Sequence, residues 1–317
     1  MLRYILHRLI SLLPILFIMS IITFSFLHLI PGDPVDFMLG ETATGEQRAS
    51  LFAELGLDRP LYIQYLSWIG NILQGDLGNS VITRRPVLAT ILEKLPASVL
   101  LASSSSFLAL LIALVLGTFA GAHRGTLKDI FVLILALLGV SIPIFWLGII
   151  LVLFFSIQFP LFPSIGYVDI FKDFFKGLHH LVLPAITLAA NMAGAVTRVT
   201  RSEMIEQLSK DYVTTAWAKG LSRRSILYKH ALKNALIPVV TLTGLQMGSQ
   251  IGGALVVETI FGWPGVGSLL MHSIFARDYI MAQGIILFLA VTVTLINLLV
   301  DISYTFLNPQ IRLSSQS

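Results

Sequence analysis

The sequence predicts an all-α polytopic membrane protein with six transmembrane helices. Of its 317 residues, 12% are charged and 56% are hydrophobic, whereas about 25% of the residues in a soluble globular domain are charged. This deficit has a physical cause, because charged side chains are costly in hydrocarbon. Six apolar runs reach the length of about 20 residues that a spanning helix needs, and Lys and Arg are distributed unevenly between the loops that join these runs.

The predicted spans are residues 9–30, 97–122, 130–159, 181–199, 235–261 and 280–306. We expect the first to be a retained helix rather than a cleaved signal peptide, because Pro31-Gly32-Asp33-Pro34 follows it without a small-residue cleavage site. The third is too long for one straight crossing perpendicular to the membrane. It also contains Pro143, which predicts a kink or a tilt.

Basic residues set the orientation of the spans. They precede the first span, separate the second from the third and the fourth from the fifth, and follow the sixth. Six spans put these four regions on one side of the membrane, and an excess of Lys and Arg marks that side as the cytoplasm. Both termini are therefore predicted to be cytoplasmic. The residues concerned are Arg3, Arg8, Arg124, Lys128, Arg198, Arg201, Lys210, Lys219, Arg223, Arg224, Lys229, Lys233 and Arg312.

This topology divides the chain into residues 1–30 with the first span, an outer loop or cap at 31–96, a core at 97–307 and a tail at 308–317. Within the outer segment we expect a helix over 46–55, a turn at 57–60 and an amphipathic helix over 61–73 that carries Tyr62, Tyr65 and Trp68. The last helix fits two interpretations, a packed cap or a helix on the membrane surface with an aromatic belt.

The cytoplasmic segment between the fourth and fifth spans, within residues 200–235, predicts two short helices joined at Gly220. Asp211 is positioned to cap a helix that starts at Tyr212, and Ser222 to cap the next. Gly220 ends the first helix with a left-handed residue. We expect the small side chains on one face of the first helix to form an exposed knob on which another protein docks.

The fifth span contains Gly244, Gly248 and Gly252 at intervals of four residues. Small residues at this spacing let another helix approach closely. They predict helix packing, either within this chain or against a second membrane subunit. The second span has a weaker version of the pattern at Gly117 and Gly121.

A few polar residues lie inside the predicted spans, where each is costly. Asn191 lies in the fourth span, and Gln246 and Gln250 share a face of the fifth. They predict either the lining of an aqueous pore or hydrogen bonds to a neighbouring helix. The sequence shows no clear intramembrane carboxylate and no clear broken helix, which a secondary carrier needs.

Several chemistries are absent from the sequence. The chain has no cysteine, so disulfides and thiolate chemistry are excluded. Its seven histidines are scattered, which argues against a metal site. No phosphate-binding glycine loop, H-E-x-x-H or G-x-S-x-G motif is present. No basic run is long enough to indicate nucleic-acid binding. We expect no catalysis and no cofactor on this chain.

The segment from Thr214 to Gly220 resembles the signature of the membrane subunits of binding-protein-dependent ABC importers, E-A-A, three residues, then Gly. Thr214-Thr215-Ala216 stands for E-A-A here. The two threonines match the branch that imports dipeptides, oligopeptides and nickel, in particular its B-type permease. Further matches to this branch are Pro31-Gly32-Asp33-Pro34, Leu55-Gly56-Leu57-Asp58-Arg59-Pro60, Gly75-Asp76-Leu77-Gly78, Ser141-Ile142-Pro143-Ile144-Phe145-Trp146, Glu258-Thr259-Ile260-Phe261-Gly262-Trp263-Pro264-Gly265-Val266-Gly267, Arg277-Asp278-Tyr279 and Asn308-Pro309-Gln310-Ile311-Arg312.

The resemblance implies the permease fold of a type I ABC importer in the bacterial cytoplasmic (inner) membrane. This chain would form half of a pore with a second, homologous permease subunit. Two cytoplasmic ATP-binding subunits would carry ATP and Mg, and an external binding protein would deliver the substrate. Coupling to the ATPases would fall on Thr214, Thr215, Ala216, Lys219, Gly220 and Leu221.

The sequence does not decide the substrate class. The candidates are di- or oligopeptides, nickel–chelator complexes, glutathione and other small peptide-like solutes. A self-sufficient secondary carrier or channel, and a membrane enzyme, are the remote alternatives.

Overall fold

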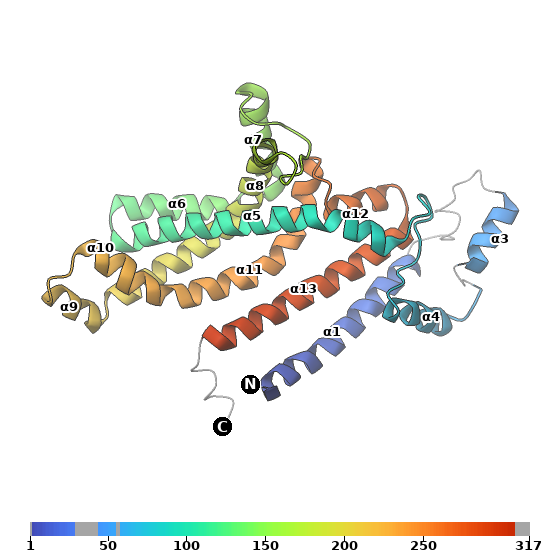
Figure 1. Ribbon diagram of the computed structural model, residues 1–317, viewed down its shortest axis with the longest axis horizontal. Helices are drawn as coiled ribbons and strands as arrows, with labels where there is room; N and C mark the ends of the chain where they lie inside the picture. Colours follow the sequence, from blue (N-terminus) through green and yellow to red (C-terminus); the bar gives the residue numbers. More distant parts are fainter. Residues whose placement is uncertain (1, 29–43, 55–57, 308–317) are drawn as a thin grey trace. The chain divides into compact units, whose positions relative to one another are not determined.

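The structure is a computed structural model that describes residues 2–28, 44–54 and 58–307 (Figure 1). The described residues are helical almost throughout, and β pairing among them is limited to one isolated bridge between Asn79 and Pro86. The elements labelled η1 and η2 are π-helical turns. In chain order the elements are α1 (Leu2–His28), α3 (Gly45–Glu54), α4 (Leu61–Leu73), α5 (Val87–Ala122), α6 (Leu127–Ser141), α7 (Ile144–Val152), η1 (Leu153–Gln158), α8 (Phe174–Leu208), α9 (Asp211–Ala218), α10 (Arg223–Ser225), η2 (Ile226–Ala231), α11 (Leu232–Ile260), α12 (Val266–Phe275) and α13 (Tyr279–Leu307).

Helices occupy most of the described residues of each of the six predicted spans. α5, α8 and the stretch Tyr279–Val300 of α13 are long and apolar enough to cross a membrane, and α6 together with α7 and η1 makes a fourth candidate. α11 is long enough but is not among them, because its glutamine, threonine and glycine residues lower its mean hydropathy. The apolar stretch of α1, Ile10–Ser25, is shorter. The all-α class is confirmed, and the count of six crossings stays a prediction.

The third predicted span is broken. α6 ends at Ser141, α7 begins at Ile144, and the two segments are bent by 104°. Pro143 explains the break, because proline has no N–H to donate and disfavours helical geometry at the residue before it. Ile142 accordingly has extended backbone angles, with φ −73° and ψ 125°. The predicted kink or tilt underestimated the bend. The expectation that the chain has no clear broken helix was wrong.

The chain divides into two compact units, residues 1–97 with 264–295 and residues 98–263 with 296–317. In the first unit, α4 packs on α1 through aromatic rings. The ring centroid of Phe24 lies 5.4 Å from that of Tyr65 and 5.7 Å from that of Trp68, and the hydroxyls of Ser20 and Tyr65 are 2.7 Å apart. Tyr62 is exposed instead. These contacts favour a packed cap over a helix that lies free on the membrane surface.

Asp278 joins two separate motifs within the first unit. It precedes α13, where its carboxylate accepts a hydrogen bond from the Met281 amide at 3.2 Å, as a helix N-cap does. The same carboxylate accepts from the Ser80 hydroxyl and from the Val81 amide. The Arg277-Asp278-Tyr279 motif thereby fixes the loop that follows Gly75-Asp76-Leu77-Gly78. Helix α12, just upstream, was not predicted.

In the second unit, α8 forms the centre and is the most extensively buried helix. It packs against α6, α7 and α11. α6 approaches it closely at Gly139 and Gly194, where an added Cβ would collide with the backbone of the other helix. α5 approaches at Gly117 and Gly121, which face Thr200 and Met204. Small residues therefore set the distance between these helices, as expected where packing drives helix association.

We expect Gly194→Leu to destabilise the second unit by about 1–3 kcal/mol, the usual cost of forcing extra volume into a packed site. The side chain would meet the carbonyl of Ala136, and backbone cannot move aside as a flexible side chain can. Gly252→Leu is the matched control, because nothing lies within 4 Å of a Cβ at that position. The thermal unfolding midpoint of the purified chain measures both, and equal midpoints would contradict this account of the packing.

Candidate functional site

The elbow, defined here as residues 211–231, lies beyond the ends of α8 and α11 (Figure 1). α9 ends in a Schellman motif: the Gly220 amide donates to the Trp217 carbonyl at 2.9 Å, and the Leu221 amide donates to the Ala216 carbonyl at 3.2 Å. This motif requires a left-handed residue, and Gly220 has φ +75°. Sequence reasoning predicted this hinge correctly.

The helical segment after Gly220, α10 with η2, is not a separate helix. The Ser222 hydroxyl accepts from the Ser225 amide at 3.4 Å and caps α10, as predicted. α10 then runs through the π turn η2 directly into α11. The predicted cap at Asp211 was wrong, because α9 starts one residue earlier, with Lys210 in the capping position and no side-chain cap bond.

The small-residue face of α9 points into the elbow. Val213 and Ala216 are buried and pack with Ile226 of η2, flanked by Leu208 and Tyr212. The expectation of an exposed knob was therefore wrong for Val213 and Ala216, which hold α9 against η2. Trp217 and Gly220, predicted on the same face, are exposed. Among the residues predicted to couple to an ATPase, Ala216 has this inward position, whereas Thr214, Thr215, Lys219, Gly220 and Leu221 are exposed.

Polar and apolar contacts attach the elbow to both long helices. The Tyr212 hydroxyl donates to Gln207 Oε1 of α8 at 3.1 Å and accepts from Asn234 Nδ2 of α11 at 3.3 Å. Met204 of α8 packs with Ala231 and Ala235. The elbow is therefore attached to α8 and α11 together.

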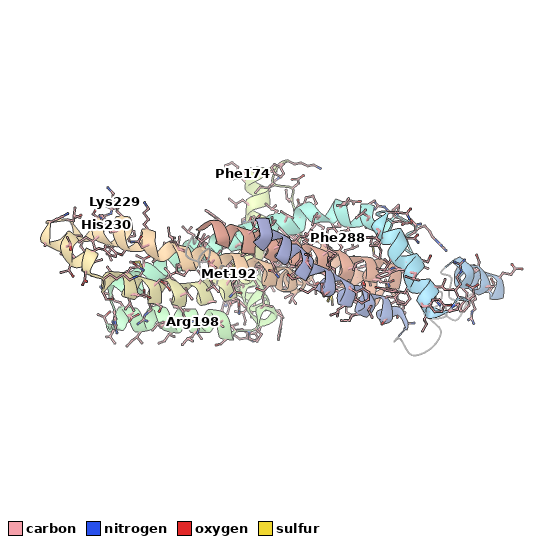
Figure 2. The ribbon with its side chains drawn as sticks, turned by 90° about the horizontal axis from the view of Figure 1, so that it is seen from below. Phe174, Met192, Arg198, Lys229, His230 and Phe288 are labelled. Atoms are coloured by element: carbon pink, nitrogen blue, oxygen red, sulfur yellow. The ribbon has the colours of Figure 1, made fainter. Side chains whose placement is uncertain are left out.

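The surface of the elbow is basic. Lys219, Arg223, Arg224 and Lys229 are exposed, and Figure 2 shows Lys229 projecting at this end of the unit, away from Met192. Arg223 also donates to the Ala122 carbonyl at the end of α5 at 3.2 Å. The loop that follows α5 thus lies beside the elbow, which agrees with the charge pattern that assigned both loops to one side of the membrane.

A buried ion pair near the elbow was not predicted. Arg201 of α8 binds Asp129 of α6 through two of its three guanidinium nitrogens, Nε to Oδ1 at 2.5 Å and Nη2 to Oδ2 at 2.7 Å, and Asp129 is 2% exposed. The Gly125 amide also donates to this carboxylate at 3.0 Å. The sequence signal was an acidic residue in the first turn of an apolar helix, but nothing in the sequence identified its partner.

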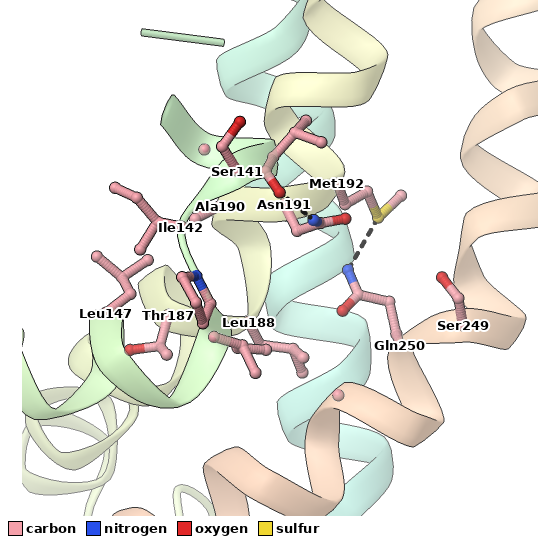
Figure 3. A pocket seen from close by; sticks show the side chains of 15 residues that line it. Ser141, Ile142, Leu147, Thr187, Leu188, Ala190, Asn191, Met192, Ser249 and Gln250 are labelled. Atoms are coloured by element: carbon pink, nitrogen blue, oxygen red, sulfur yellow. Dashed lines mark hydrogen bonds between the residues drawn. The ribbon is translucent and has the colours of Figure 1, made fainter. Parts of the chain in front are cut away.

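The second candidate region is a cavity at the break between α6 and α7 (Figure 3). Asn191 and Gln250, two of the three predicted pore-lining residues, line it. Gln246 does not, and its side-chain oxygen accepts from the Ser249 hydroxyl at 3.1 Å. Asn191 donates to the Val140 carbonyl at 3.3 Å. Asn191 thus bonds a neighbouring helix, as one of the two interpretations expected, while the lining of an aqueous pore stays a prediction.

The three glycines of α11 have different surroundings. Gly244 faces Val300 and Gly248 faces Asn297, both near the end of α13. Nothing lies within 4 Å of a Cβ built at Gly252. The first two positions therefore pack within the chain, and Gly252 presents an open surface.

Comparison with known proteins assigns the chain to a family. Residues 113–313 match the family described as binding-protein-dependent transport system inner membrane component, and residues 1–102 match the N-terminal region of such components. The chain belongs to this family. For an inner membrane component of a transport system, an exposed elbow attached to two long helices is a surface on which other subunits of the system can act.

Relatives of this inner membrane component cover nearly its whole length. The di/tripeptide transport system permease protein DppB of Pseudomonas aeruginosa (strain UCBPP-PA14) is 42% identical over 333 residues, which cover 98% of this chain and 99% of the relative. The dipeptide transport system permease protein DppB of Escherichia coli (strain K12) is 40% identical over 336 residues, with the same coverage. The glutathione transport system permease protein GsiC of Salmonella typhimurium (strain LT2) is 40% identical over 312 residues, again with the same coverage.

We expect Ala216→Asp to open the elbow, because an unpaired charge would be buried between α9 and η2 at a cost of several kcal/mol. Each 1.4 kcal/mol changes an equilibrium about tenfold, so trypsin should cut after Arg223 or Arg224 at least about tenfold faster. Thr214→Asp adds the same charge on the exposed face of α9 and is the control. Equal cleavage rates in the two variants would show that the Val213–Ala216 face does not hold the elbow closed.

We expect Asp129→Asn to destabilise the chain by about 3 kcal/mol. Removing one partner of a buried ion pair costs about 3–5 kcal/mol, and the Arg201 side chain keeps some access to solvent, at 23% exposure. The same change at Asp173, whose side chain is 41% exposed, is the comparison and should have little effect. Thermal unfolding of both variants in detergent measures the difference, and matching curves would refute a stabilising role for the pair.

Proposed function

We propose that the chain is the translocation subunit of an ATP-driven importer that moves di- or oligopeptides across the cytoplasmic membrane by alternating access. The observation that carries this proposal is the full-length similarity to permeases named for di/tripeptide and dipeptide transport. The elbow supports it, because a rigid surface attached to both α8 and α11 can transmit displacement into the core.

The proposed assembly contains four kinds of subunit. A second, homologous permease completes the pore, two ATP-binding subunits dock on the elbows from the cytoplasm, and an external binding protein delivers the substrate. Both termini of this chain lie in the cytoplasm. The exposed residues Thr214, Thr215, Lys219 and Leu221 contact an ATPase, while Ala216 positions them from inside the elbow. ATP and Mg bind to the partner subunits.

Glutathione is the second candidate substrate, because a relative at 40% identity is named for its transport. A nickel–chelator complex stays a third candidate within the same architecture. Proteoliposomes that contain the four kinds of subunit decide among them by ATP-dependent uptake of labelled dialanine, glutathione or a nickel–histidine complex. Gradient-driven uptake by this chain alone would overturn the proposal in favour of a secondary carrier.

We expect Gly220→Val to abolish uptake while the protein still inserts, because a β-branched residue resists the left-handed conformation of the hinge. Gly220→Asn should retain uptake, because asparagine tolerates that conformation. Gly75→Val is the matched control: Gly75 also has positive φ and open space around it, but it lies outside the elbow. Uptake by Gly220→Val at the wild-type rate, or its equal loss in Gly75→Val, would contradict the role of the elbow.

A further inference from the structure

The break in the third span leaves two helix ends facing the cavity. Carbonyls in the last turn of α6 and amides in the first turn of α7 have no partners in the helical pattern, because Pro143 interrupts it. The end of α6 carries a partial negative charge, and the start of α7 carries a partial positive charge. Gly139–Ile144 line the cavity at this junction.

The cavity has the size of a small-ligand site. Its volume is about 340 Å³, near the lower end of the range of about 300–1,000 Å³ typical of ligand pockets. Its polar lining residues are all neutral: Ser141, Thr187, Asn191, Ser249 and Gln250. The remaining lining side chains are apolar. The lining side chains can therefore pair with an amide, and any charged group of a ligand has to be met by the two helix ends.

Gln250 has only a weak hydrogen-bond partner in the described part of the chain. Its side chain points into the cavity region (Figure 3), it is 5% exposed, and its Nε2 donates to the sulfur of Met192 at 3.0 Å. A thioether is a weak acceptor. Gln250 Oε1 accepts no hydrogen bond from any residue in the described part of the chain. A ligand amide that bonds both of these groups offers each a stronger partner than the one it has.

Asn191 supplies a second amide to the lining of the cavity. Its Nδ2 donates to the Val140 carbonyl at the end of α6 at 3.3 Å, while its Oδ1 has no bond to any described residue. Asn191 comes from α8 and Gln250 from α11, so the two amides reach the cavity from different helices. Each can donate to a carbonyl and accept from an N–H, which is the pairing that a peptide bond requires.

We infer that the cavity at the α6–α7 break is a transient subsite for the main chain of a small zwitterionic peptide during translocation. Gln250 and Asn191 bond its amide, the carbonyl end of α6 receives its ammonium group, and the amide end of α7 receives its carboxylate. The inference rests on the proposed function and deepens it. No lining group selects a peptide side chain, so the subsite recognises backbone rather than sequence.

The absence of cysteine allows a direct test in the full importer complex. Ser141→Cys places a thiol in the cavity, and Phe275→Cys places one at a residue that is 78% exposed elsewhere. Labelling by a small thiol reagent is followed by the mass of this chain. Dialanine should slow labelling at position 141 and leave position 275 unchanged. Its N-methylated amide analogue, which lacks the N–H, should protect about tenfold less well, as for one lost hydrogen bond of about 1.4 kcal/mol.

Gln250→Leu should abolish the protection by dialanine, because leucine keeps the volume of the side chain and removes its amide. Gln246→Leu is the matched control, one turn away on the same helix and outside the cavity lining. Asn191→Leu repeats the test at an exposed residue whose replacement does not disturb the core. Protection that survives both Gln250→Leu and Asn191→Leu, or that is lost equally in Gln246→Leu, overturns the subsite.

Failure of the subsite and failure of the proposed function give different results. If the wild-type complex imports dialanine but dialanine never protects position 141, the subsite is wrong and the importer stands. If the wild-type complex imports no peptide, the proposed substrate class is wrong, and the inferred subsite is wrong as well.

Discussion

Close approach of helix backbones at small residues is the constraint on which the second unit depends. Lipid chains are as apolar as leucine side chains, so burial of apolar surface cannot hold membrane helices together and packing must do so. Gly117, Gly121, Gly139 and Gly194 let α5 and α6 reach α8 at backbone distance. The Asp129–Arg201 ion pair then fixes α6 against α8 beside the elbow. The elbow and the cavity both take their geometry from this packing.

The elbow and the cavity differ in how their local chemistry is satisfied. In the elbow, the backbone groups at the hinge find partners through the Schellman motif, and its inner face is closed by Val213, Ala216 and Ile226. In the cavity, a proline break exposes helix ends, and Gln250 is left with a sulfur acceptor. A segment whose polar groups have hydrogen-bond partners suits a rigid contact. A segment whose polar groups lack strong partners suits a site that a solute occupies briefly.

The sequence predicted features with strong local signals. Hydropathy located the helices, and Gly220 and Ser222 gave the hinge and the cap because their chemistry acts within a few residues. Features that depend on distant partners were missed. Nothing local pairs Asp129 with Arg201 or Ser80 with Asp278, and the alternation of small and large residues in α9 could not tell an inner face from an exposed one. Pro143 predicted a distortion of the helix. The size of the bend, and the cavity beside it, depend on how α8 and α11 pack around the break.

The continuity of α10, η2 and α11 has a mechanical consequence. At a rise of about 1.5 Å per residue, the helical path from Ser225 to Gln250 is roughly 38 Å long. Part of the elbow and the buried Gln250 therefore belong to one continuous helical segment. A tilt of about 5° about the elbow end would carry Gln250 sideways by roughly 3 Å, more than the tolerance of a hydrogen bond. A displacement of this size at the elbow would suffice to make or break contacts deep in the second unit without unfolding any helix.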